Sequence, residues 1–337
     1  MKIGIIGDQH FKDNLSYADY IDDRRVAEKK EILDFIVDSF KDCKHVVFMG
    51  DNFNSKNNSS EVNREFIEFL ERFGTKELYI ISGNHEKKGD GKTAIDFIGE
   101  IKKTNWHIFT KPNSIEIEEM KIDFLPYMLN SELEETTHED ATKKIVKELK
   151  GGDIMFTHHA LTGTTFNGMK SELLREIVLP REKLEKKYKI IIAGHIHQPQ
   201  NVGNTLVTGS LFTSEVNEIE KFIYKIDDKL ELEKFKVPAR EIHKIENPTE
   251  TQLKKIPSNS IVKVIVKDKK IDVTKVEKNL KRFDAQLLIE DYPSTRKKMK
   301  IEKGAFDFSI EALLKLYSES KKVDYQKLKK GLELIND

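Results

Sequence analysis

Five short polar turns along the chain carry side chains of the types that bind metal ions. The turns contain Asp8 and His10, then Asp51, then Asn84, His85 and Glu86, then His158 and His159, and finally His195 and His197. Six of the ten histidines of the chain lie in these turns. Carboxylate, amide and imidazole ligands without a thiolate suit manganese, iron, zinc or cobalt better than magnesium or calcium.

The spacing within two of the turns favours joint binding of one cation. Asp8 and His10 are separated by one residue, as are His195 and His197, so in an extended segment both side chains of a pair lie on the same side. The whole set is too large for one ion. Two ions about 3.5 to 4 Å apart that share a carboxylate would use it, and such a pair serves hydrolytic displacement at phosphorus.

Each turn follows a short run of β-branched or aromatic residues that predicts a strand. The runs cover residues 3–6, 46–49, 78–81, 154–157 and 190–193. Apolar residues at helical spacing predict helices over residues 24–40 and 62–73. Strands that alternate with helices are typical of an α/β domain, and ligands bind where the strands of such a sheet end. The five turns are therefore expected to converge.

Other strands indicate that the sheet is not purely parallel. Alternating apolar residues over 114–127 predict an antiparallel hairpin. Further short strands are expected over 200–226, where Gly203-Asn204 and Gly209-Ser210 mark turns. The predicted fold class is α/β in the form of an α+β sandwich, a two-layered mixed β core flanked by helices, over residues 1–235.

The second part of the chain predicts a small module and terminal helices. Pro238, Pro248 and Pro257 punctuate a polar stretch that is typical of a linker. Beyond it, a strand over 261–266, a helix over 273–283 and a strand over 285–289 predict a small α/β capping module, assigned to residues 236–300. Residues 301–337 contain two predicted amphipathic helices.

The charge of the chain is balanced overall and uneven locally. Lys and Arg number 58, as do Asp and Glu, so no whole-molecule basic field attracts nucleic acid. Residues 251–300 nevertheless hold 14 Lys and Arg against 6 Asp and Glu. A positive module of this kind binds DNA phosphates without regard to sequence, although solvated lysines that aid solubility explain any single position equally well. The candidate DNA contacts are Lys267, Lys269, Lys270, Lys281, Arg282, Arg296, Lys297 and Lys298.

Cysteine content and hydropathy bear on the compartment. Cys43 is the one cysteine, which excludes an intrachain disulfide framework and a cysteine-only zinc site and fits a reducing cytosol. The longest apolar runs are only a few residues, whereas a membrane span needs roughly 18 or more. A cytoplasmic protein without a membrane partner is expected, in the host cytoplasm if a phage encodes it.

The ordered motifs resemble those of a known enzyme superfamily. Asp-x-His, Gly-Asp, Gly-Asn-His-Glu, His-His and Gly-His-x-His, spread over about residues 1–230, are similar to the motifs of calcineurin-like metallophosphoesterases. Within that superfamily the chain resembles the SbcD-type nuclease subunits of DNA repair, including the recombination endonuclease subunits of large phages. Leu125-Pro126-Tyr127, the Gly209-Ser210 pair and the size of the C-terminal extension carry this finer resemblance.

The resemblance implies two divalent metal ions, most simply Mn²⁺, and a role for each motif residue. The first ion would be held by Asp8, His10, Asp51 and His197. The second ion would be held by the bridging Asp51 and by Asn84, His158 and His195. A hydroxide between the ions would attack phosphorus.

Residues beside the ligands are expected to assist. The resemblance makes His85 the catalytic group that stabilises the transition state or protonates the leaving oxygen, and Glu86 its orienting carboxylate. His159 would touch substrate or support a ligand. In the second motif the nuclease families usually have an apolar pair and then Asp or His after Gly-Asp, where this chain has Asn52, Phe53 and Asn54.

The activity that the resemblance implies is a manganese-dependent DNA nuclease. It would act as an exonuclease on duplex ends and as an endonuclease on single strands, with an SbcC-like coiled-coil ATPase as partner and as a homodimer. The helices within 306–335 would dock on the ATPase, or else fold back on the small module. The alternatives are a stand-alone phosphodiesterase or phosphatase acting on a small ester, and a non-catalytic scaffold. A phosphoprotein phosphatase is disfavoured because the segment 50–56 lacks the second Asp and the Arg of that class.

Overall fold

The structure is a computed structural model that describes residues 1–17, 25–88, 91–214, 216, 218, 220–268, 270–289, 318 and 324–329. The chain divides into two units, Met1–Glu290 and Asp291–Asp337. In the second unit only Ser318 and residues 324–329 are described, and residues 325–329 are helical. The rest of the two predicted terminal helices lies outside the described residues.

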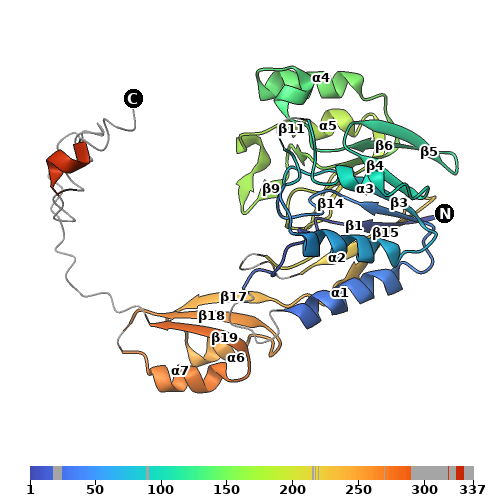
Figure 1. Cartoon of the computed structure of the whole chain (residues 1–337). Helices are drawn as coiled ribbons and strands as arrows, with labels where there is room; N and C mark the ends of the chain where they lie inside the picture. Colours follow the sequence, from blue (N-terminus) through green and yellow to red (C-terminus); the bar gives the residue numbers. More distant parts are fainter. Residues whose placement is uncertain are drawn as a thin grey trace. The chain divides into compact units, whose positions relative to one another are not determined.

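A first six-stranded sheet contains three of the five predicted strands (Figure 1). Its order is β16-β15-β1-β2-β3-β4, with β1 to β4 parallel and with β15 antiparallel to both β1 and β16. The strands are β1 (Lys2–Ile6), β2 (His45–Phe48), β3 (Glu77–Ile81), β4 (Trp106–Phe109), β15 (Phe222–Asp227) and β16 (Leu232–Lys236).

A second six-stranded sheet contains the other two, in the order β13-β14-β12-β7-β6-β5. The strands are β5 (Asn113–Ile117), β6 (Met120–Leu125), β7 (Gly152–Thr157), β12 (Tyr188–Ala193), β13 (Gln200–Val202) and β14 (Thr205–Val207). β6, β7, β12 and β14 are parallel, while β5 and β13 are antiparallel to their neighbours. The β5–β6 pair confirms the predicted hairpin.

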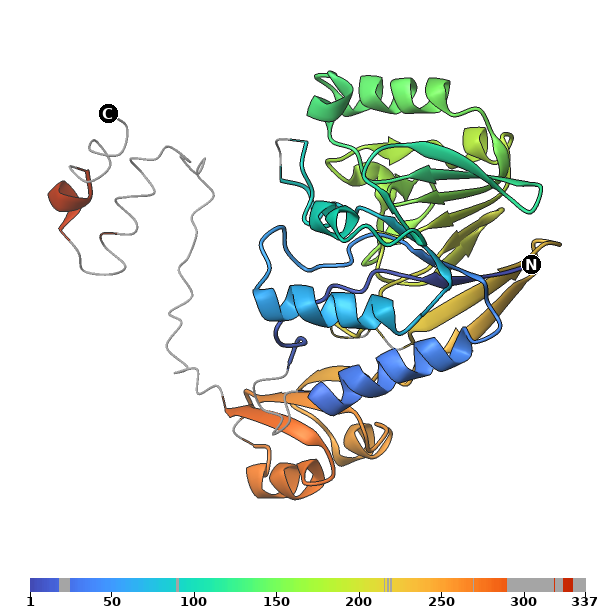
Figure 2. The same ribbon diagram turned by 45° about the vertical axis from the view of Figure 1, so that its right-hand side comes forward.

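The two sheets pack face to face, with helices on both outer surfaces (Figures 1 and 2). One buried cluster joins the inner faces, where Ile3 and Ile5 of β1 meet Ile122 and Phe156 of the second sheet. A second cluster packs the first sheet against α1 (Val26–Ser39) and α2 (Ser60–Glu71), and a third packs the other sheet against α4 (His138–Glu148) and α5 (Arg181–Leu184). This four-layer arrangement confirms the predicted fold class.

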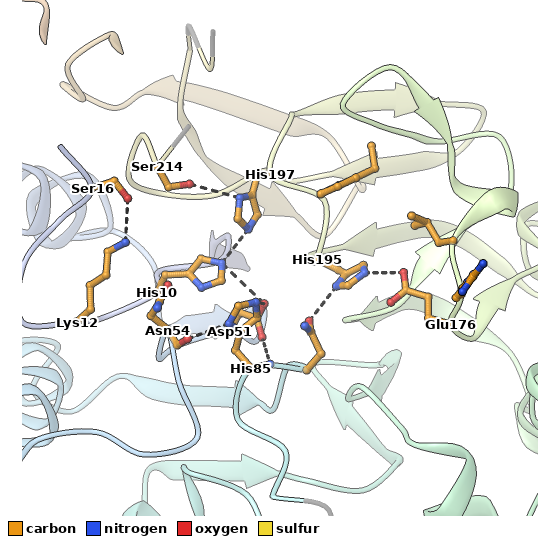
Figure 3. Close-up of a pocket in the computed structure, with 14 residues that line it drawn as sticks. His10, Lys12, Ser16, Asp51, Asn54, His85, Glu176, His195, His197 and Ser214 are labelled. Carbon is orange, nitrogen blue, oxygen red and sulfur yellow. Dashed lines mark hydrogen bonds and ion pairs between the residues drawn. The ribbon is translucent and has the colours of Figure 1, made fainter. Parts of the chain in front are cut away.

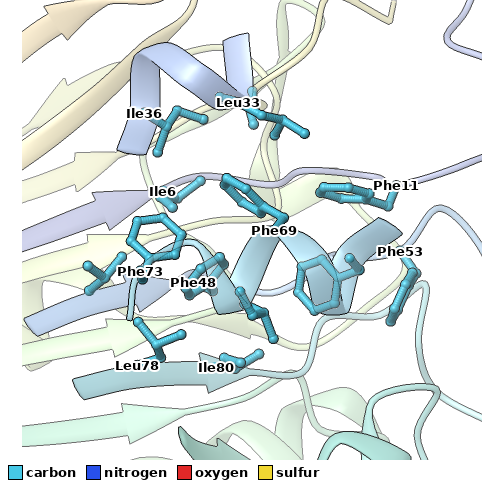
Figure 4. Packing of buried hydrophobic residues seen from close by; sticks show 14 of the residues in the cluster. Ile6, Phe11, Leu33, Ile36, Phe48, Phe53, Phe69, Phe73, Leu78 and Ile80 are labelled. Atoms are coloured by element: carbon cyan, nitrogen blue, oxygen red, sulfur yellow. The ribbon is translucent and has the colours of Figure 1, made fainter. Parts of the chain in front are cut away.

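Aromatic packing under α2 holds two of the turns in place (Figure 4). Ser59 caps this helix by accepting a hydrogen bond from Val62 N at 3.2 Å. Below the helix, the ring of Phe66 contacts the rings of Phe11 at 5.1 Å and Phe53 at 4.9 Å between centroids. Phe11 follows His10, and Phe53 lies two residues after Asp51. The core therefore anchors the backbone beside these two polar turns.

Shorter elements connect the sheets and surround the strand ends. They are α3 (Asp96–Glu100), η1 (Asn130–Leu133), β8 (Ala160–Leu161), β9 (Thr165–Phe166), β10 (Met169–Lys170), η2 (Ser171–Leu173) and β11 (Val178–Leu179). β9 and β10 form a small antiparallel hairpin, and β8 pairs with β11 in parallel. The segment from β8 to β11 thus folds as one insertion between β7 and β12.

A third sheet, β17-β18-β19, forms the small module with α6 (Glu250–Lys254) and α7 (Val273–Leu280). Its strands are β17 (Ile242–Glu246), β18 (Ile261–Val266) and β19 (Asp284–Ile289), all parallel. The boundaries at residues 235 and 300 stay predictions. Among the described residues, no helix is both long and apolar enough to cross a membrane.

The polar stretch that the prolines indicated as a linker is structured, and that prediction was wrong. It forms β17 and α6. β17 pairs with β18 over its whole length, from Ile242 opposite Ile261 onward, and Thr249 caps α6 by accepting from Gln252 N at 3.2 Å. With His243, Lys244 and Glu246 around only two isoleucines, β17 lacks the regular alternation that predicts a strand. Its backbone hydrogen bonds come from pairing with a distant segment.

Candidate metal centre

The five polar turns converge at one edge of the sandwich. Figure 3 shows His10, Asp51, His85 and His195 from these turns around one pocket. In the first sheet, Asp8 follows β1, Asp51 follows β2 and Asn84 follows β3; in the second sheet, His158 follows β7 and His195 follows β12. Because these five strands run parallel within their sheets, their carboxyl ends meet at this edge. The convergence expected from the sequence is present, and both sheets contribute to it.

Backbone hydrogen bonds fix the turns to one another. The amides of Gln9 and His10 donate to Asp51 O at 3.1 and 2.8 Å, and the amide of His195 donates to Asp8 Oδ1 at 3.1 Å. His10, Asp51 and His195 all have positive φ, at 48°, 44° and 76°. Left-handed backbone costs a non-glycine residue about 1 to 3 kcal/mol and persists only where the surroundings impose it. Three ligand candidates are thus held in strained positions.

A first group of donors is formed by Asp8, His10 and His197, of which one atom each lies within 4.8 Å of the others. His10 Nε2 and His197 Nε2 face each other at 2.8 Å, and His10 Nε2 lies 3.8 Å from Asp51 Oδ2. These residues follow β1, β2 and β12, which places both sheets around the group.

A second group is formed by Asp51, His158 and His195. His158 Nε2 lies 3.3 Å from Asp51 Oδ2. Asn84 Oδ1 lies 2.9 Å from His195 Nδ1 and 3.2 Å from His158 Nε2, so it joins this group. Asp51 Oδ2 approaches His10 of the first group as well as His158 of the second, which is the position of a shared carboxylate.

The donors present fit divalent cations. Asp8 Oδ2 and His10 Nδ1 are buried without a hydrogen-bond partner among the described residues, a costly state for polar atoms unless a ligand binds there. Within both groups, imidazole nitrogens and carboxylate oxygens face one another, with few protons available to form hydrogen bonds between them. The residues that would hold the metal are Asp8, His10, Asp51 and His197 in one group and Asp51, Asn84, His158 and His195 in the other. Bound divalent ions supply Lewis acidity and acidify a bound water.

Burial and opposite charges set the protonation of the donors. Burial lowers the pKa of His10 to about 3, which keeps the ring neutral, as a metal ligand must be. Burial opposes the charged form of His158, but the carboxylates of Asp51 and Asp8 outweigh it and raise the pKa to about 10. Burial likewise raises the pKa of Asp51, yet His158 reverses this and the net pKa is lowered. In the metal-free protein, the protonated His158 ring thus supplies the positive charge that a bound metal ion would otherwise supply.

His85 differs from the ligands in its exposure. Its side chain is 41% exposed, and its Nδ1 faces Asn54 O at 2.9 Å. Since a carbonyl only accepts, Nδ1 donates to Asn54 O, and Nε2 faces Asp51 Oδ2 at 4.0 Å. Distance alone would group His85 with His10 and Asp51 as a ligand. Its access to solvent suits proton transfer to a substrate.

Glu86 does not orient His85, contrary to the expectation. Its buried carboxylate accepts from Asn52 Nδ2 at 2.9 Å, from Phe53 N at 3.0 Å and from Gly83 N at 2.6 Å. No contact of Glu86 with the His85 ring occurs among the described residues. Burial and the nearby Asp51 raise the pKa of Glu86 to about 7. Glu86 therefore ties the turn after β2 to the turn after β3. It does not reach the His85 ring, because these adjacent side chains point in different directions.

His159 lies behind the site rather than in it. The residue is fully buried, its Nε2 accepts from Met128 N at 3.1 Å, and its ring stacks on Tyr127 at 4.9 Å. Burial lowers the pKa of His159 to about 3, so the ring is neutral. His159 thus contacts Met128 and Tyr127, and its predicted roles, contact with substrate or support of a ligand, stay predictions.

Two acidic residues at the site were missed by sequence reasoning. Glu176 Oε1 lies 2.8 Å from His195 Nε2, and Glu176 Oε2 accepts from Tyr127 OH at 3.3 Å. Glu218 Oε1 lies 3.6 Å from His197 Nδ1, and Oε2 lies 2.9 Å from Lys221 Nζ. Neither glutamate belongs to a motif, and neither directly follows a strand. Only their contacts with the two histidines reveal them.

An open pocket of about 490 Å³ lies over the centre (Figure 3). Ligand candidates and His85 form part of its lining. Six more lining residues are Lys12, Ser16, Phe166, Leu174, Arg175 and Ser214.

The predicted DNA-binding residues of the small module lie elsewhere. Lys267 pairs with Glu246 at 2.9 Å, and Lys270 and Lys281 are exposed. Arg282 Nη2 donates to the carbonyl of Leu253 near the end of α6, so this side chain has a structural task. Lys269, Arg296, Lys297 and Lys298 lie outside the described residues. None of the four described positions lines the pocket over the metal centre.

Comparisons with known proteins bear on the family of the chain. A comparison with curated proteins gave no match. A solved structure, described as a structural and functional characterization of a novel archaeal phosphodiesterase, matches 70% of this chain and 100% of its own at 16% identity and a TM-score of 0.35. The family model of the calcineurin-like phosphoesterases matches residues 1–199, which contain all five metal-binding turns. The chain therefore belongs to the calcineurin-like phosphoesterase family.

Proposed function

We propose that the chain is a manganese-dependent DNA nuclease that hydrolyses phosphodiester bonds with two metal ions. The two ions, held by the two donor groups, would supply Lewis acidity and acidify a bound water, and His85 would protonate the leaving oxygen. The enzyme acts as an exonuclease on the ends of duplex DNA and as an endonuclease on single-stranded DNA. Membership of the phosphoesterase family limits the chemistry to phosphoester hydrolysis; the DNA substrate is our proposal.

One observation carries the proposal. Donors for two ions lie together, and those that line the open pocket are His10, Asp51, Asn84, His195 and His197. His85, exposed in that pocket, offers Nε2 to a bound phosphoester. Leaving-group protonation matters most for an alkoxide, such as the sugar oxygen released from a nucleic acid strand. The mixed nitrogen and oxygen donors, without thiolate, support manganese.

The partners are a further part of the proposal. The positive charge of residues 251–300 supports contact with DNA phosphates. Apolar residues at helical spacing within 306–335 support docking of a helix on an SbcC-like coiled-coil ATPase. A homodimer completes the assembly expected of SbcD-type subunits. Removal of residues 301–337 should abolish stimulation by the ATPase and spare the metal content.

The test uses purified protein with Mn²⁺ on linear duplex DNA, on a single-stranded oligonucleotide and on 4-nitrophenyl phosphate. Asp51→Asn should lower bound metal and abolish DNA hydrolysis, because Asp51 serves both donor groups. Asp38→Asn is the matched control, since Asp38 is 68% exposed on α1 and belongs to neither donor group.

Two results would contradict the proposal. Hydrolysis of the small ester alone, with and without a candidate ATPase, would favour the stand-alone phosphodiesterase or phosphatase. Absence of bindable metal would favour the non-catalytic scaffold.

A further inference from the structure

Two cationic side chains line the pocket over the metal centre without a carboxylate partner. Lys12 Nζ donates to Ser16 Oγ at 3.0 Å, and no carboxylate lies within ion-pair distance of it among the described residues. Arg175 is exposed and makes no ion pair within the same part of the chain. Elsewhere on the protein, lysines do pair with carboxylates, as Lys30 does with Asp34 at 2.6 Å. Unpaired cations beside a phosphoesterase site are available to a substrate anion.

The two cations belong to different halves of the centre. Lys12 lies two residues after His10 of the first donor group, and Figure 3 shows its side chain beside His10 and Ser16. Arg175 precedes Glu176, which binds His195 of the second donor group at 2.8 Å. In Figure 3, Glu176 lies beyond His195, on the other side of the centre from Lys12. If both metal ions held a phosphoester, Lys12 would thus lie on one side of it and Arg175 on the other.

A nucleic acid strand matches this arrangement better than a small ester does. Its scissile phosphate has another phosphate on each side along the backbone, and each phosphate carries a negative charge. A phosphate monoester or a small diester has no such neighbours. Arg175 also lies next to Leu174, and Phe166 of β9 lines the same pocket. An unstacked base can pack on an aromatic ring of this kind.

We propose that Lys12 and Arg175 bind the two phosphates that flank the scissile phosphodiester, and that they make the site select polynucleotide strands over small phosphoesters. This inference rests on the proposed nuclease function and deepens it by naming the residues that recognise the strand. Among the described residues, no hydrogen bond or ion pair joins Lys12 or Arg175 to a metal donor, so their effect falls on substrate choice.

The experiment compares two substrates of the Mn²⁺-loaded full chain, a single-stranded oligonucleotide and bis(4-nitrophenyl) phosphate. For Lys12→Ala and for Arg175→Ala, the ratio of kcat/KM on the oligonucleotide to kcat/KM on the small diester should fall about tenfold, through KM, since a charge-assisted contact is lost. The dependence of log KM on log salt should become shallower by about 0.7 per variant. Lys12→Arg and Arg175→Lys, which keep the charge, should recover most of the ratio.

Lys147→Ala on α4 and Arg64→Ala on α2 are matched controls, because neither residue lines the pocket. They should leave the ratio and the salt slope as in the unaltered chain. Thermal unfolding and bound metal are measured for each variant, so that a folding defect is recognised. If Lys12→Ala is misfolded, Lys12→Gln replaces it with a chain of similar length.

The outcomes separate the two levels of the proposal. If the unaltered chain cleaves the small diester and leaves the oligonucleotide intact, the nuclease function itself fails. If it cleaves both, and the variants lower both activities equally or lower neither, the flanking-phosphate role is wrong while the nuclease function stands.

Discussion

Glu176 and His195 form a carboxylate–imidazole pair at the edge of the metal centre. Glu176 Oε1 lies 2.8 Å from Nε2 of His195, and Nδ1 of the same ring faces Asn84 Oδ1 at 2.9 Å. A carboxylate that holds one ring nitrogen fixes the tautomer and leaves the other nitrogen as an acceptor for a metal ion. Glu176 thereby determines which nitrogen His195 presents to the second donor group.

Removal of this carboxylate should weaken metal binding at the second group. We expect Glu176→Ala to lower the affinity of one Mn²⁺ site by about 10- to 100-fold, with the other site little changed. Glu176→Gln keeps an oxygen that can accept from Nε2–H and should lose less. Calorimetric titration of the metal-free protein with Mn²⁺ measures both sites. Equal affinities in all three proteins would show that Glu176 has no part in positioning His195.

The glycine before Asp51 should be indispensable. Gly50 has a φ of +96°, and a Cβ on it would lie 2.4 Å from His158 Nδ1, the nitrogen that faces Met49 O at 2.6 Å. Gly50→Ala should therefore displace His158, weaken metal binding and lower the free energy of unfolding by about 2 kcal/mol.

A glycine elsewhere provides the control for this substitution. A Cβ on Gly99 in α3 would meet nothing within 4 Å, and the φ of Gly99 is not positive, so Gly99→Ala should retain metal binding and stability. Urea denaturation and Mn²⁺ titration test both variants. Normal metal binding by Gly50→Ala would refute the tight packing of His158 against this turn.

Metal binding should release protons and strengthen as the pH rises. Asp51 and Asp8 outweigh burial and raise the pKa of His158 to about 10, so its ring is protonated at about pH 7.5 in the metal-free protein. A metal must displace that proton, and below pH 10 its apparent affinity should increase about tenfold per pH unit for each proton released. Titrations in buffers of different ionisation enthalpy count the protons.

The raised pKa of His158 has the opposite effect on the stability of the metal-free protein, which falls as the pH rises. The folded pKa of His158 lies above the unfolded value of 6.5, so its contribution to stability is full below pH 6.5 and is lost as the pH rises toward 10.

The control for the proton-release experiment is His138→Gln, a substitution of an exposed histidine on α4, which should leave the number of protons released on metal binding as it is. Metal binding without proton release would contradict the charged state of His158.

The aromatic cluster below α2 should dominate the stability of the first sheet. Phe66 is fully buried and contacts the rings of Phe11, Phe48 and Phe53. Phe66→Ala should lower the free energy of unfolding by about 3 to 5 kcal/mol. Phe35→Ala on α1, where the ring is only partly buried, should cost less. Urea denaturation measures both, and equal losses would mean that the cluster has no special weight.

The metal-binding turns could be predicted because their determinants are local. A short β-branched run specifies a strand, and in an α/β sheet the residues after parallel strands meet at one edge whatever their separation in sequence. The positions of Asp8, Asp51 and His158 follow from that rule. In the structure, Ile3 and Ile5 of β1 lie toward the second sheet and Ile6 lies toward the helices.

Tertiary structure alone decided the residues around those donors. Glu176 reaches His195 because the insertion between β7 and β12 folds over the strand ends, and no periodicity marks such a contact. Glu86 turns away from His85 because its carboxylate satisfies three buried donors that come from two different turns. β17 exists because β18 supplies its hydrogen bonds. Local patterns specify what a segment prefers, whereas buried polar groups and unpaired strands are satisfied only by partners that the fold brings from elsewhere.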